Sequence, residues 1–378
     1  GTAIVGTISG SAITFGSETV FESASIDHQT ITFDDNSNKV VIAYRDGGAG
    51  KARVGTVSGT SISFGSSTTF ESSGIEGVGI TFDANNNKVV ISYADLGNSS
   101  YGTAVVGTVS GTSISFGTPA AFESGRTDYT SAAFDSSNNK VVISYSDKDN
   151  SNYGTAVVAT VSGTSISFGS VVVYTSEYTV YNAIVFDSNV NKVVISYRAA
   201  TDGDKGKSVV GTVSGTSISF GSAATFASGG AGIVAATYDT SLNKVLVAYN
   251  DKGNSNYGTI ALGSVSGTSI SFESGAVFES AAVDDVTITY DANANKSAVF
   301  YYDEGNSFYG TASVFTAGST NLTSENFLGF AAHTYADTQS ALVNSTCTVD
   351  RNQSGLTAGQ TYYVQTDGSL GTTAADPS

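Results

Sequence analysis

Three observations predict that this 378-residue chain is an all-β protein. First, the string Val-Ser-Gly-Thr-Ser-Ile-Ser-Phe recurs with a period of 52 residues, and a looser copy begins at Ile8; the full copies begin at Val57, Val109, Val161, Val213 and Val265. Second, runs rich in β-branched and aromatic residues alternate with turn residues inside each repeat. Third, no stretch shows an apolar period of about 3.6 residues with caps, so helices are not expected. About four strands in each repeat of about 50 residues are typical of a β-propeller.

The strands of one repeat are clearest in the copy that contains Ser131. A short first strand over Ser131–Phe134 leads into Asp135–Asn139, a hairpin turn of residues that tolerate left-handed or self-bonded backbone. The run Lys140–Ser146 is dense in β-branched and aromatic residues and predicts a buried second strand. The remaining segments, in chain order, are a polar loop over 147–154, a third strand over 155–161, a tight turn at 162–164 and a fourth strand over 165–168.

The way in which the ring closes is less plain. The chain begins with the last two strands of a repeat, Thr2–Thr7 and Ala12–Phe15, and the sixth repeat ends near Phe315. The leading pair needs inner strands, and two later segments resemble such strands: 329–335 matches 232–238, and 340–343 matches 244–247. We favour seven blades over six, with the repeats over 1–317 and a C-terminal β-module over 318–378 whose first part completes the last blade. In the competing interpretation, 321–378 is a separate small β-module.

Composition excludes several classes of partner. The net charge is −17, and only 16 basic residues are spread along the chain, which argues against nucleic acid and against docking on anionic lipid. No apolar run approaches the roughly 20 residues of a membrane span, so membrane insertion is not expected. The single cysteine, Cys347, leaves no internal disulfide and no Cys-based zinc cluster. Because residue 1 falls inside a strand pattern and the chain has no Met, we expect it to be a trimmed or processed piece.

Catalytic residues are scarce. The two histidines, His28 and His333, have no metal-ligand spacing, and His28 is expected in a variable loop, either solvated or in contact with a ligand. Propellers include sialidase-like hydrolases, but such a site needs clustered arginines and a pair of carboxylates. Only five arginines exist, and most acidic residues recur in every repeat, which indicates structure. We therefore expect no enzyme activity.

Recurrent aspartates raise the question of calcium. Turns such as Asp83-Ala-Asn-Asn-Asn87 resemble the start of a calcium loop, but they lack the glycine and the glutamate that complete one. We interpret them as Asx-type hairpin turns. A second set, Asp95, Asp147, Asp251 and Asp303, begins the loops between the second and third strands, where capping of the loop is favoured. No cofactor is predicted, and calcium remains the minor alternative.

Two parts of the sequence resemble known proteins. The repeats, for example Gly102–Gly117, resemble repeat proteins of marine bacteriophages. The segments Glu325–Ala332 and Ser354–Leu370 are similar to a module near the ends of phage virion and tail-fibre proteins, which usually continues beyond the point that corresponds to Ser378. The resemblance implies a location on the virion surface or outside the cell, and it carries no catalytic residues to this chain.

Positions that vary between repeats are the candidates for binding, because loops on a rigid scaffold concentrate binding residues. Two stretches vary most: the connection from the fourth strand to the next blade, and the residues after the tyrosine of the second strand. In an up-and-down blade both lie on one face. The candidate residues are tyrosines that can stack on sugar rings, arginines that can hold an anion, and two polar neighbours in the same stretches: Tyr129, Tyr178, Tyr181, Arg45, Arg198, Asp128 and His28. The alternative is that these stretches vary under weak constraint.

These observations favour a non-enzymatic virion or tail-fibre protein whose propeller recognises a host surface glycan or protein. Other virion proteins would then be partners, and a homo-oligomer through the C-terminal module would add avidity. Two alternatives remain: a purely structural module that decorates or spaces the particle, and a bacterial cell-surface lectin or adhesin.

Overall fold

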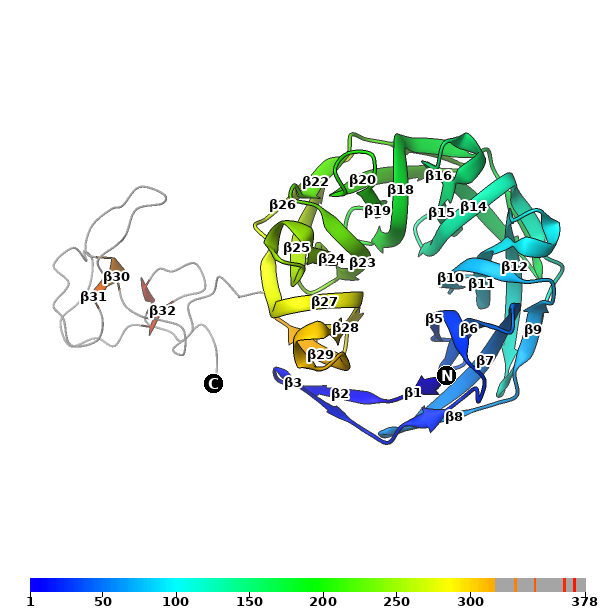
Figure 1. The fold of residues 1–378 in the computed structure, drawn as a ribbon, viewed down its shortest axis with the longest axis horizontal. Helices are drawn as coiled ribbons and strands as arrows, with labels where there is room; N and C mark the ends of the chain where they lie inside the picture. The colour runs from blue at the N-terminus through cyan, green and yellow to red at the C-terminus, as the bar shows by residue number, and fades with distance from the viewer. Residues whose placement is uncertain (317–329, 332–342, 345–362, 365–369, 372–378) are drawn as a thin grey trace. The chain divides into compact units, whose positions relative to one another are not determined.

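The computed structural model describes residues 1–316 and four two-residue strands in the remainder of the chain. The chain divides into two compact units, Gly1–Phe315 and Thr316–Ser378. In the first unit, radial antiparallel sheets follow one another around a ring (Figure 1), which is the arrangement of a β-propeller. The all-β prediction is confirmed. Among the described residues, no helix has the length and apolar character that a bilayer crossing requires.

Six sheets contain inner strands within residues 1–316, and each is named here by its first strand. The first strands line the centre of the ring (Figure 1). They are β5 (Ile26–Asp34), β10 (Ile75–Asp83), the second half of β14 (Ala120–Asp135), the second half of β18 (Val172–Asp187), β23 (Ala231–Asp239) and the second half of β27 (Ala276–Asp291). Their second strands are β6 (Lys39–Asp46), β11 (Lys88–Asp95), β15 (Lys140–Asp147), β19 (Lys192–Ala199), β24 (Lys244–Asp251) and β28 (Lys296–Asp303).

Third strands continue each sheet outward, and they are β7 (Ala49–Ser58), β12 (Tyr101–Ser110), β16 (Tyr153–Ser162), β20 (Lys205–Ser214), β25 (Tyr257–Ser266) and β29 (Tyr309–Phe315). The outer edge differs from the prediction, because it consists of two pieces. One is the predicted fourth strand, seen as β8 (Ser61–Phe64), β13 (Ser113–Phe116), β17 (Ser165–Phe168), β21 (Ser217–Phe220) and β26 (Ser269–Phe272). The other is β9 (Thr68–Glu71), β22 (Ala224–Ala227) or the first half of β14, β18 or β27.

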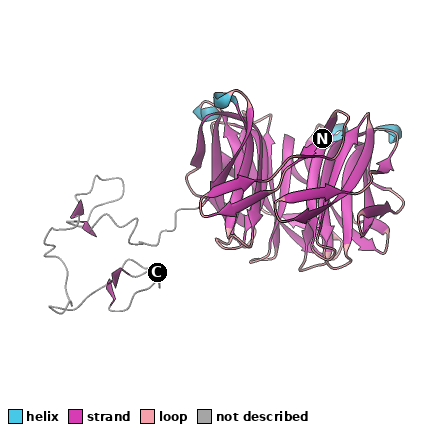
Figure 2. Cartoon of the chain, turned by 90° about the horizontal axis from the view of Figure 1, so that it is seen from below, coloured by secondary structure: helices cyan, strands magenta, loops and turns pink. Residues whose placement is uncertain are grey.

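We expected a loop between the fourth strand of one blade and the first strand of the next. That prediction is wrong for β14, β18 and β27, each of which is one continuous strand across the connection. In β14, residues 120–126 pair with β12 of one blade, and residues 127–135 pair with β15 of the next. The chain passes from blade to blade without leaving strand conformation, because both halves find backbone partners. Four short 3₁₀ helices, η1 (Leu96–Asn98), η2 (Lys148–Asn150), η3 (Lys252–Asn254) and η4 (Glu304–Asn306), follow second strands. They lie on one face of the ring, called here the η face (Figure 2).

The hairpin turns that begin with Asp are of the predicted Asx type. Asp83 Oδ1 accepts the amide protons of Asn85 and Asn86, both at 3.0 Å, so this hairpin turn is of the Asx type. On the η face, Asp95 accepts from the amide of Gly97, and Asp147 accepts from the amide of Asn150. Asp251 caps η3 in the same way, whereas Asp303 makes no such bond at η4.

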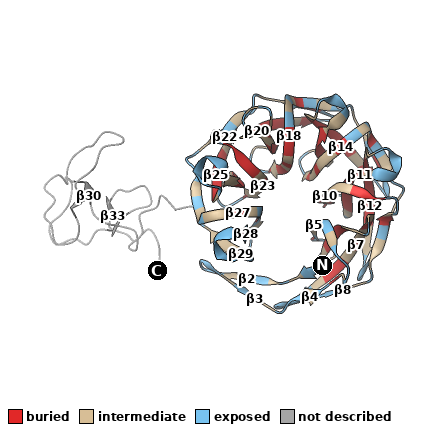
Figure 3. Ribbon diagram, viewed as in Figure 1, coloured by how far each residue is buried: buried red, intermediate tan, exposed pale blue. Residues whose placement is uncertain are grey.

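The core lies between adjacent sheets. Second strands other than β28 are buried on both faces (Figure 3), which explains why their sequences are continuous apolar runs. Val41 and Ala43 of the β5 blade, for example, belong to one cluster with Ile80, Phe82 and Ile91 of the β10 blade. An aromatic ring from the outer edge of each blade also contacts the buried tyrosine of the next, as Phe70 contacts Tyr93 with ring centroids 5.2 Å apart.

Four short strands at the N-terminus precede β5 in the first unit. They are β1 (Thr2–Ala3), β2 (Gly6–Ser9), β3 (Ala12–Phe15) and β4 (Thr19–Val20). The second unit has two antiparallel pairs among its described residues, β30 (Phe330–Ala331) with β31 (Val343–Asn344) and β32 (Tyr363–Val364) with β33 (Leu370–Gly371). The predicted match of 329–335 and 340–343 to inner strands lies outside the described residues except for β30 and part of β31, so it stays a prediction. The number of blades also stays a prediction.

Candidate functional site

A β-bulge near the η face interrupts each first strand. The pairing of β14 with β15 passes from Asp128 to Ser131, so Tyr129 and Thr130 stand opposite the single residue Tyr145. The corresponding bulges turn the backbone into the left-handed region at His28, Gly77, Tyr129, Tyr181 and Asp285, with φ between 47° and 54°. Non-glycine residues adopt this region at a cost of about 1–3 kcal/mol, and only when the surrounding structure imposes it. The bulge thus redirects one side chain in the four of these first strands whose left-handed residue is not glycine.

Three of the candidate side chains meet at adjacent bulges. The rings of Tyr129 and Tyr181 lie 5.2 Å apart between centroids, with an angle of 58° between their planes. The guanidinium of Arg198, on the neighbouring strand β19, lies 5.0 Å from the centroid of Tyr181. This is within the range of a cation–π interaction. Together they form the central cluster, defined here as Tyr129, Tyr181 and Arg198.

Charged side chains surround the guanidinium of Arg198, the cation of the central cluster. The Arg198 Nε atom lies 3.4 Å from Asp204 Oδ1, and Lys252 donates to the other oxygen of Asp204 at 2.7 Å. The bond from Lys252 lowers the pKa of Asp204, and Arg198 adds to that effect. Burial raises the pKa of Tyr129, and Asp128, Tyr181 and Tyr178 raise it further while Arg198 opposes them. The phenol of Tyr129 is therefore a neutral hydrogen-bonding group at ordinary pH.

Tyr178 and Asp128 lie beside the central cluster. Tyr178 is exposed, and its amide donates to Thr201 Oγ1 at 3.3 Å in the loop after β19. Asp128 accepts the amide proton of Tyr129 at 2.9 Å and forms an ion pair with Lys148 at 2.9 Å. Asp128 therefore stabilises the backbone of the bulge, and its charge is paired with that of Lys148.

Arg45 and His28 belong to a different blade. Arg45 forms two bonds to the carboxylate of Asp27, at 2.6 Å and 2.5 Å, and donates to the carbonyl of Ile75 at 3.2 Å. These bonds to Arg45 lower the pKa of Asp27. The expectation that His28 lies in a loop is wrong, because it is an exposed bulge residue inside β5. The structure thus gathers four of the seven candidates around one cluster with Asp128 beside them in sequence, and leaves Arg45 and His28 at the β5 blade.

Sequence comparison missed three residues that shape this region. Asp204 stands in the loop after β19, where no repeated pattern marks it, and Lys252 begins η3, at the position that Lys148 occupies in η2. In the β23 blade, Asn250 Oδ1 accepts the amide proton of Ile233 at 2.7 Å, next to the bulge residue Gly232. A signal was present for Asn250, since it occupies the variable position that Arg45 and Arg198 occupy in other blades.

The described arginines do not converge. Arg45 and Arg53 lie in the β5 blade but pair with different carboxylates, those of Asp27 and Glu22, while Arg126 pairs with Asp149 and Arg198 with Asp204 in other blades. Arg351 lies outside the described residues. The recurrent aspartates serve turns and caps, as described above.

Comparison with known proteins concerns the fold of this chain. No protein-family model matches the sequence, and no curated protein matches it. Among solved structures, the BP39L lectin from Burkholderia pseudomallei aligns over 82% of this chain and 86% of its own, with a TM-score of 0.59 and 12% sequence identity. Trypanosoma rangeli sialidase aligns over 83% of this chain with a TM-score of 0.48 and 13% identity, and the alignment spans 59% of the sialidase. AofleA from Arthrobotrys oligospora aligns over 76% of this chain and 82% of its own, with a TM-score of 0.48 and 10% identity. At these identities the likeness concerns the fold alone, which the BP39L lectin shares.

Proposed function

We propose that this chain is a non-enzymatic, glycan-recognising β-propeller, and that the central cluster with Tyr178 contacts the sugar. The observation that carries the proposal is the pair of tyrosines held at strained bulge positions beside an arginine. Aromatic faces stack on the apolar faces of sugar rings, while phenol and guanidinium groups donate hydrogen bonds to hydroxyl or carboxylate oxygens.

A binding role explains the strain better than a structural role. The bulge needs a left-handed residue, and Gly77 shows that the scaffold accepts glycine there at no steric cost. Tyr129 and Tyr181 bring large aromatic rings to that position instead, and both remain half-buried rather than covered. Strained residues of this kind are concentrated at ligand sites.

The experiment is a glycan array probed with the full chain, followed by affinity measurement for the best glycan. Replacing Tyr129 and Tyr181 together by Ala removes the stacking surface, so we expect the affinity to fall at least about tenfold, corresponding to about 1.4 kcal/mol. The matched control is Tyr309→Ala, which removes an exposed tyrosine at another place and should leave binding unchanged. Equal affinity of the double variant, or no binding to any glycan by the folded chain, contradicts the proposal.

We further propose that the glycan is displayed by a host cell and that the chain is part of a bacteriophage particle. The resemblance of the repeats and of the segments 325–332 and 354–370 to phage virion and tail-fibre proteins supports this setting. Antibody against the chain should label intact particles in electron micrographs, at the tail or the capsid surface. Particles that carry no label after the epitope has been shown to be accessible would contradict the setting without affecting the glycan assignment.

Release of free sugar would contradict the non-enzymatic part of the proposal. The scattered arginines and the structural use of the recurrent aspartates support the absence of catalysis. Incubation of the chain with a panel of sialosides and polysaccharides, followed by chromatography, is expected to release nothing above the level of a heat-denatured sample.

A further inference from the structure

Four blades repeat one row of polar side chains near the hairpin turns, on the face of the ring opposite the η face (Figure 2). In the β14 blade, Lys140 begins the second strand, and Thr160 of the third strand pairs with Ser167 of the fourth. The adjoining pair, Val141 with Ala159, places Lys140 across from Thr160, so the three side chains lie in line on one side of the sheet. The four rows, called here the lysine rows, are Lys39, Thr56 and Ser63; Lys88, Thr108 and Ser115; Lys140, Thr160 and Ser167; and Lys192, Thr212 and Ser219.

The threonine hydroxyl of each lysine row is buried without a partner. Among the described residues, none forms a hydrogen bond with Oγ1 of Thr56, Thr108, Thr160 or Thr212. A buried hydroxyl with no partner costs stability, and valine has the same shape without that cost. Packing alone therefore does not explain a threonine in all four rows. The serine of each row is exposed, so its hydroxyl faces solvent.

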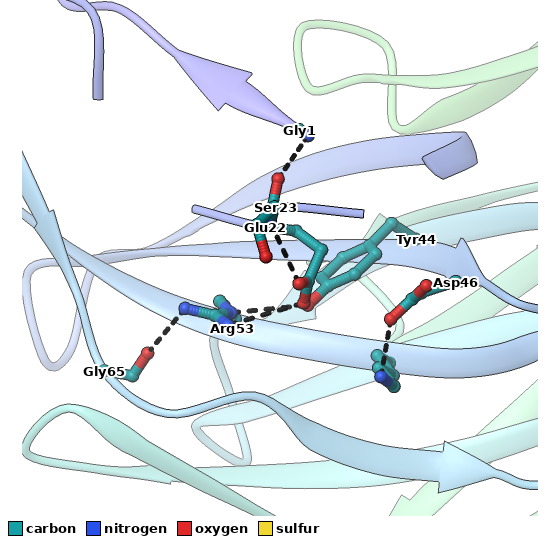
Figure 4. Close-up of polar contacts among 8 residues, drawn as sticks. Gly1, Glu22, Ser23, Tyr44, Asp46, Arg53 and Gly65 are labelled. Carbon is teal, nitrogen blue, oxygen red and sulfur yellow. Dashed lines mark hydrogen bonds and ion pairs between the residues drawn. The ribbon is translucent and has the colours of Figure 1, made fainter. Parts of the chain in front are cut away.

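The lysines of the rows differ from the basic residues elsewhere in the ring, which are paired with carboxylates. Arg53, for example, lies 3.4 Å from Glu22, and Lys51 lies 2.6 Å from Asp46 (Figure 4). The other paired residues are Arg45, Arg126, Lys148, Arg198, Lys205, Lys207 and Lys252. Within the part of the chain that the structure describes, the lysine of each lysine row forms no ion pair.

The aspartate at the start of each hairpin turn does not neutralise the lysine that ends the turn. In the β14 blade, Asp135 Oδ1 accepts the amide protons of Ser137 and Asn138, and Oδ2 accepts from the side chain of Asn138 at 2.9 Å. Both carboxylate oxygens thus serve the turn, and the ammonium group of Lys140 keeps its capacity to bind an anion.

The β23 blade shows which group such a lysine takes. There Lys244 Nζ lies 2.6 Å from Glu273 Oε1 and donates to Ser264 Oγ at 2.6 Å. Ser264 stands at the threonine position, because it pairs with Ser271 as Thr160 pairs with Ser167. In the blades with lysine rows the residue at the position of Glu273 is glycine: Gly65, Gly117, Gly169 and Gly221. A carboxylate of the chain itself therefore binds the lysine in the β23 blade, and glycine removes that carboxylate from the four lysine rows.

From these observations we propose that the lysine rows are four equivalent binding sites for the uronate sugars of an acidic polysaccharide. The lysine pairs with the sugar carboxylate as Lys244 pairs with Glu273. The threonine hydroxyl donates to the same carboxylate, and the exposed serine bonds to sugar hydroxyls. Two hydroxyl groups beside one cation match a sugar that carries hydroxyl groups beside one carboxylate, and this favours a polysaccharide over an acidic peptide. These sites are separate from the central cluster and do not depend on its assignment.

Repetition around the ring supplies the affinity that one site lacks. A single ion pair at a partly exposed lysine is weak. The net charge of −17 also repels a polyanion at a distance, although salt at physiological strength screens this repulsion beyond about 8 Å. A polymer that occupies several lysine rows at once gains avidity, whereas a short oligosaccharide does not.

The test measures binding of the full chain to immobilised polygalacturonate by biolayer interferometry. Replacing the four row lysines together by Gln should weaken binding at least about tenfold, since every site loses its cation. The matched control is Lys244→Gln, which changes a lysine at the same position whose partner is Glu273, and it should leave binding unchanged. Free trigalacturonate should compete at least about a hundredfold less well than the free polymer, and a fully methyl-esterified polymer should not bind.

A gain of binding is also expected. Glu273→Gly gives the β23 blade the glycine of the other four blades and frees Lys244 for a fifth site, so affinity should rise at least about twofold. Lys244→Gln in the same chain should cancel the rise. Replacing the four row threonines together by Val should weaken binding at least about threefold without lowering the melting temperature, because no hydrogen bond within the described residues is lost.

Three results would overturn the proposal. The first is a folded, unchanged chain that does not bind polygalacturonate. The second is equal binding by the unchanged chain and by the variant that lacks the four row lysines. The third is binding of poly-L-glutamate of matched length as tight as that of polygalacturonate, which would assign the lysine rows to an acidic peptide instead of a sugar.

Discussion

At the scale of single residues, the bulge positions separate scaffold from function. Each of the five left-handed bulge residues has the same backbone role, yet their side chains are His, Gly, Tyr, Tyr and Asp. The backbone requirement is constant, and the chemistry presented near the centre of the ring changes from blade to blade. The central cluster is the place where this variation produces contact between adjacent blades.

Arg198 should contribute to binding more than to folding. Arg198→Gln removes the cation above Tyr181 but keeps a polar side chain, so we expect glycan affinity to fall about three- to tenfold while the melting temperature changes by only a few degrees. Isothermal titration and thermal unfolding measure the two effects. Arg126→Gln, which breaks the exposed pair with Asp149, is the matched control and should change neither quantity appreciably.

The ion pairs around Asp204 predict a pH dependence. Its pKa in the folded chain is below its ordinary value of 3.8, so the pair contributes stability above that pH and loses it as the pH falls through the folded value. Because the group is partly exposed, the difference between the unchanged chain and Asp204→Asn should be at most about 1 kcal/mol at pH 7. Urea unfolding should show that difference shrinking below about pH 4. A difference that grows on acidification would contradict this assignment, and Asp35→Asn in an exposed turn serves as the control.

At the scale of elements, contact between outer edges fixes how closely blades approach. An added Cβ on Gly117, which follows β13, would lie 2.0 Å from the carbonyl oxygen of Thr164 in the next blade. The same glycine–threonine contact joins Gly16 to Thr60, Gly65 to Thr112, Gly169 to Thr216 and Gly221 to Thr268. Backbone, rather than side chains, sets the spacing of the blades at the rim.

Gly117→Ala should therefore be strongly destabilising. The clash involves a backbone oxygen that cannot rotate away, so we expect a loss of at least about 2 kcal/mol in the free energy of unfolding. Gly310→Ala is the control, because an added Cβ there has no atom within 4 Å among the described residues. Chemical denaturation of both variants measures the difference, and a Gly117→Ala chain as stable as the control would show that the rim can open to relieve the clash.

At the scale of the whole molecule, stability should be uneven around the ring. Among the described residues, the β14 and β18 blades are covered on both sides, whereas Ile31 and Phe33 of β5 and Phe300 of β28 are exposed. Residues with fewer covering contacts open locally at lower free energy. Hydrogen exchange should therefore be fastest in β1, β2, β28 and β29 and slowest in β15 and β19, by at least about tenfold. Uniform exchange rates around the ring would contradict this expectation.

The sequence revealed the repeat, the strand identities and the aspartate turns, because these depend on local patterns. The run Lys140–Ser146 could be recognised as a buried strand from its composition alone. The bulges could not, since Tyr129 and His28 are unusual residues for a left-handed backbone. Nor could the strand that crosses from one blade to the next, because Gly125 and Arg126 resemble a loop until both halves have found partners. Asp204 and Lys252 approach Arg198 only through the fold.

The contact between Gly65 and Thr112, and its counterparts around the rim, has a consequence for how such a gene changes with time. A mutation in one copy of the repeat acts on the neighbouring copy, so the glycine and the threonine cannot change independently. Unequal recombination that inserts or removes a whole repeat keeps every such contact intact.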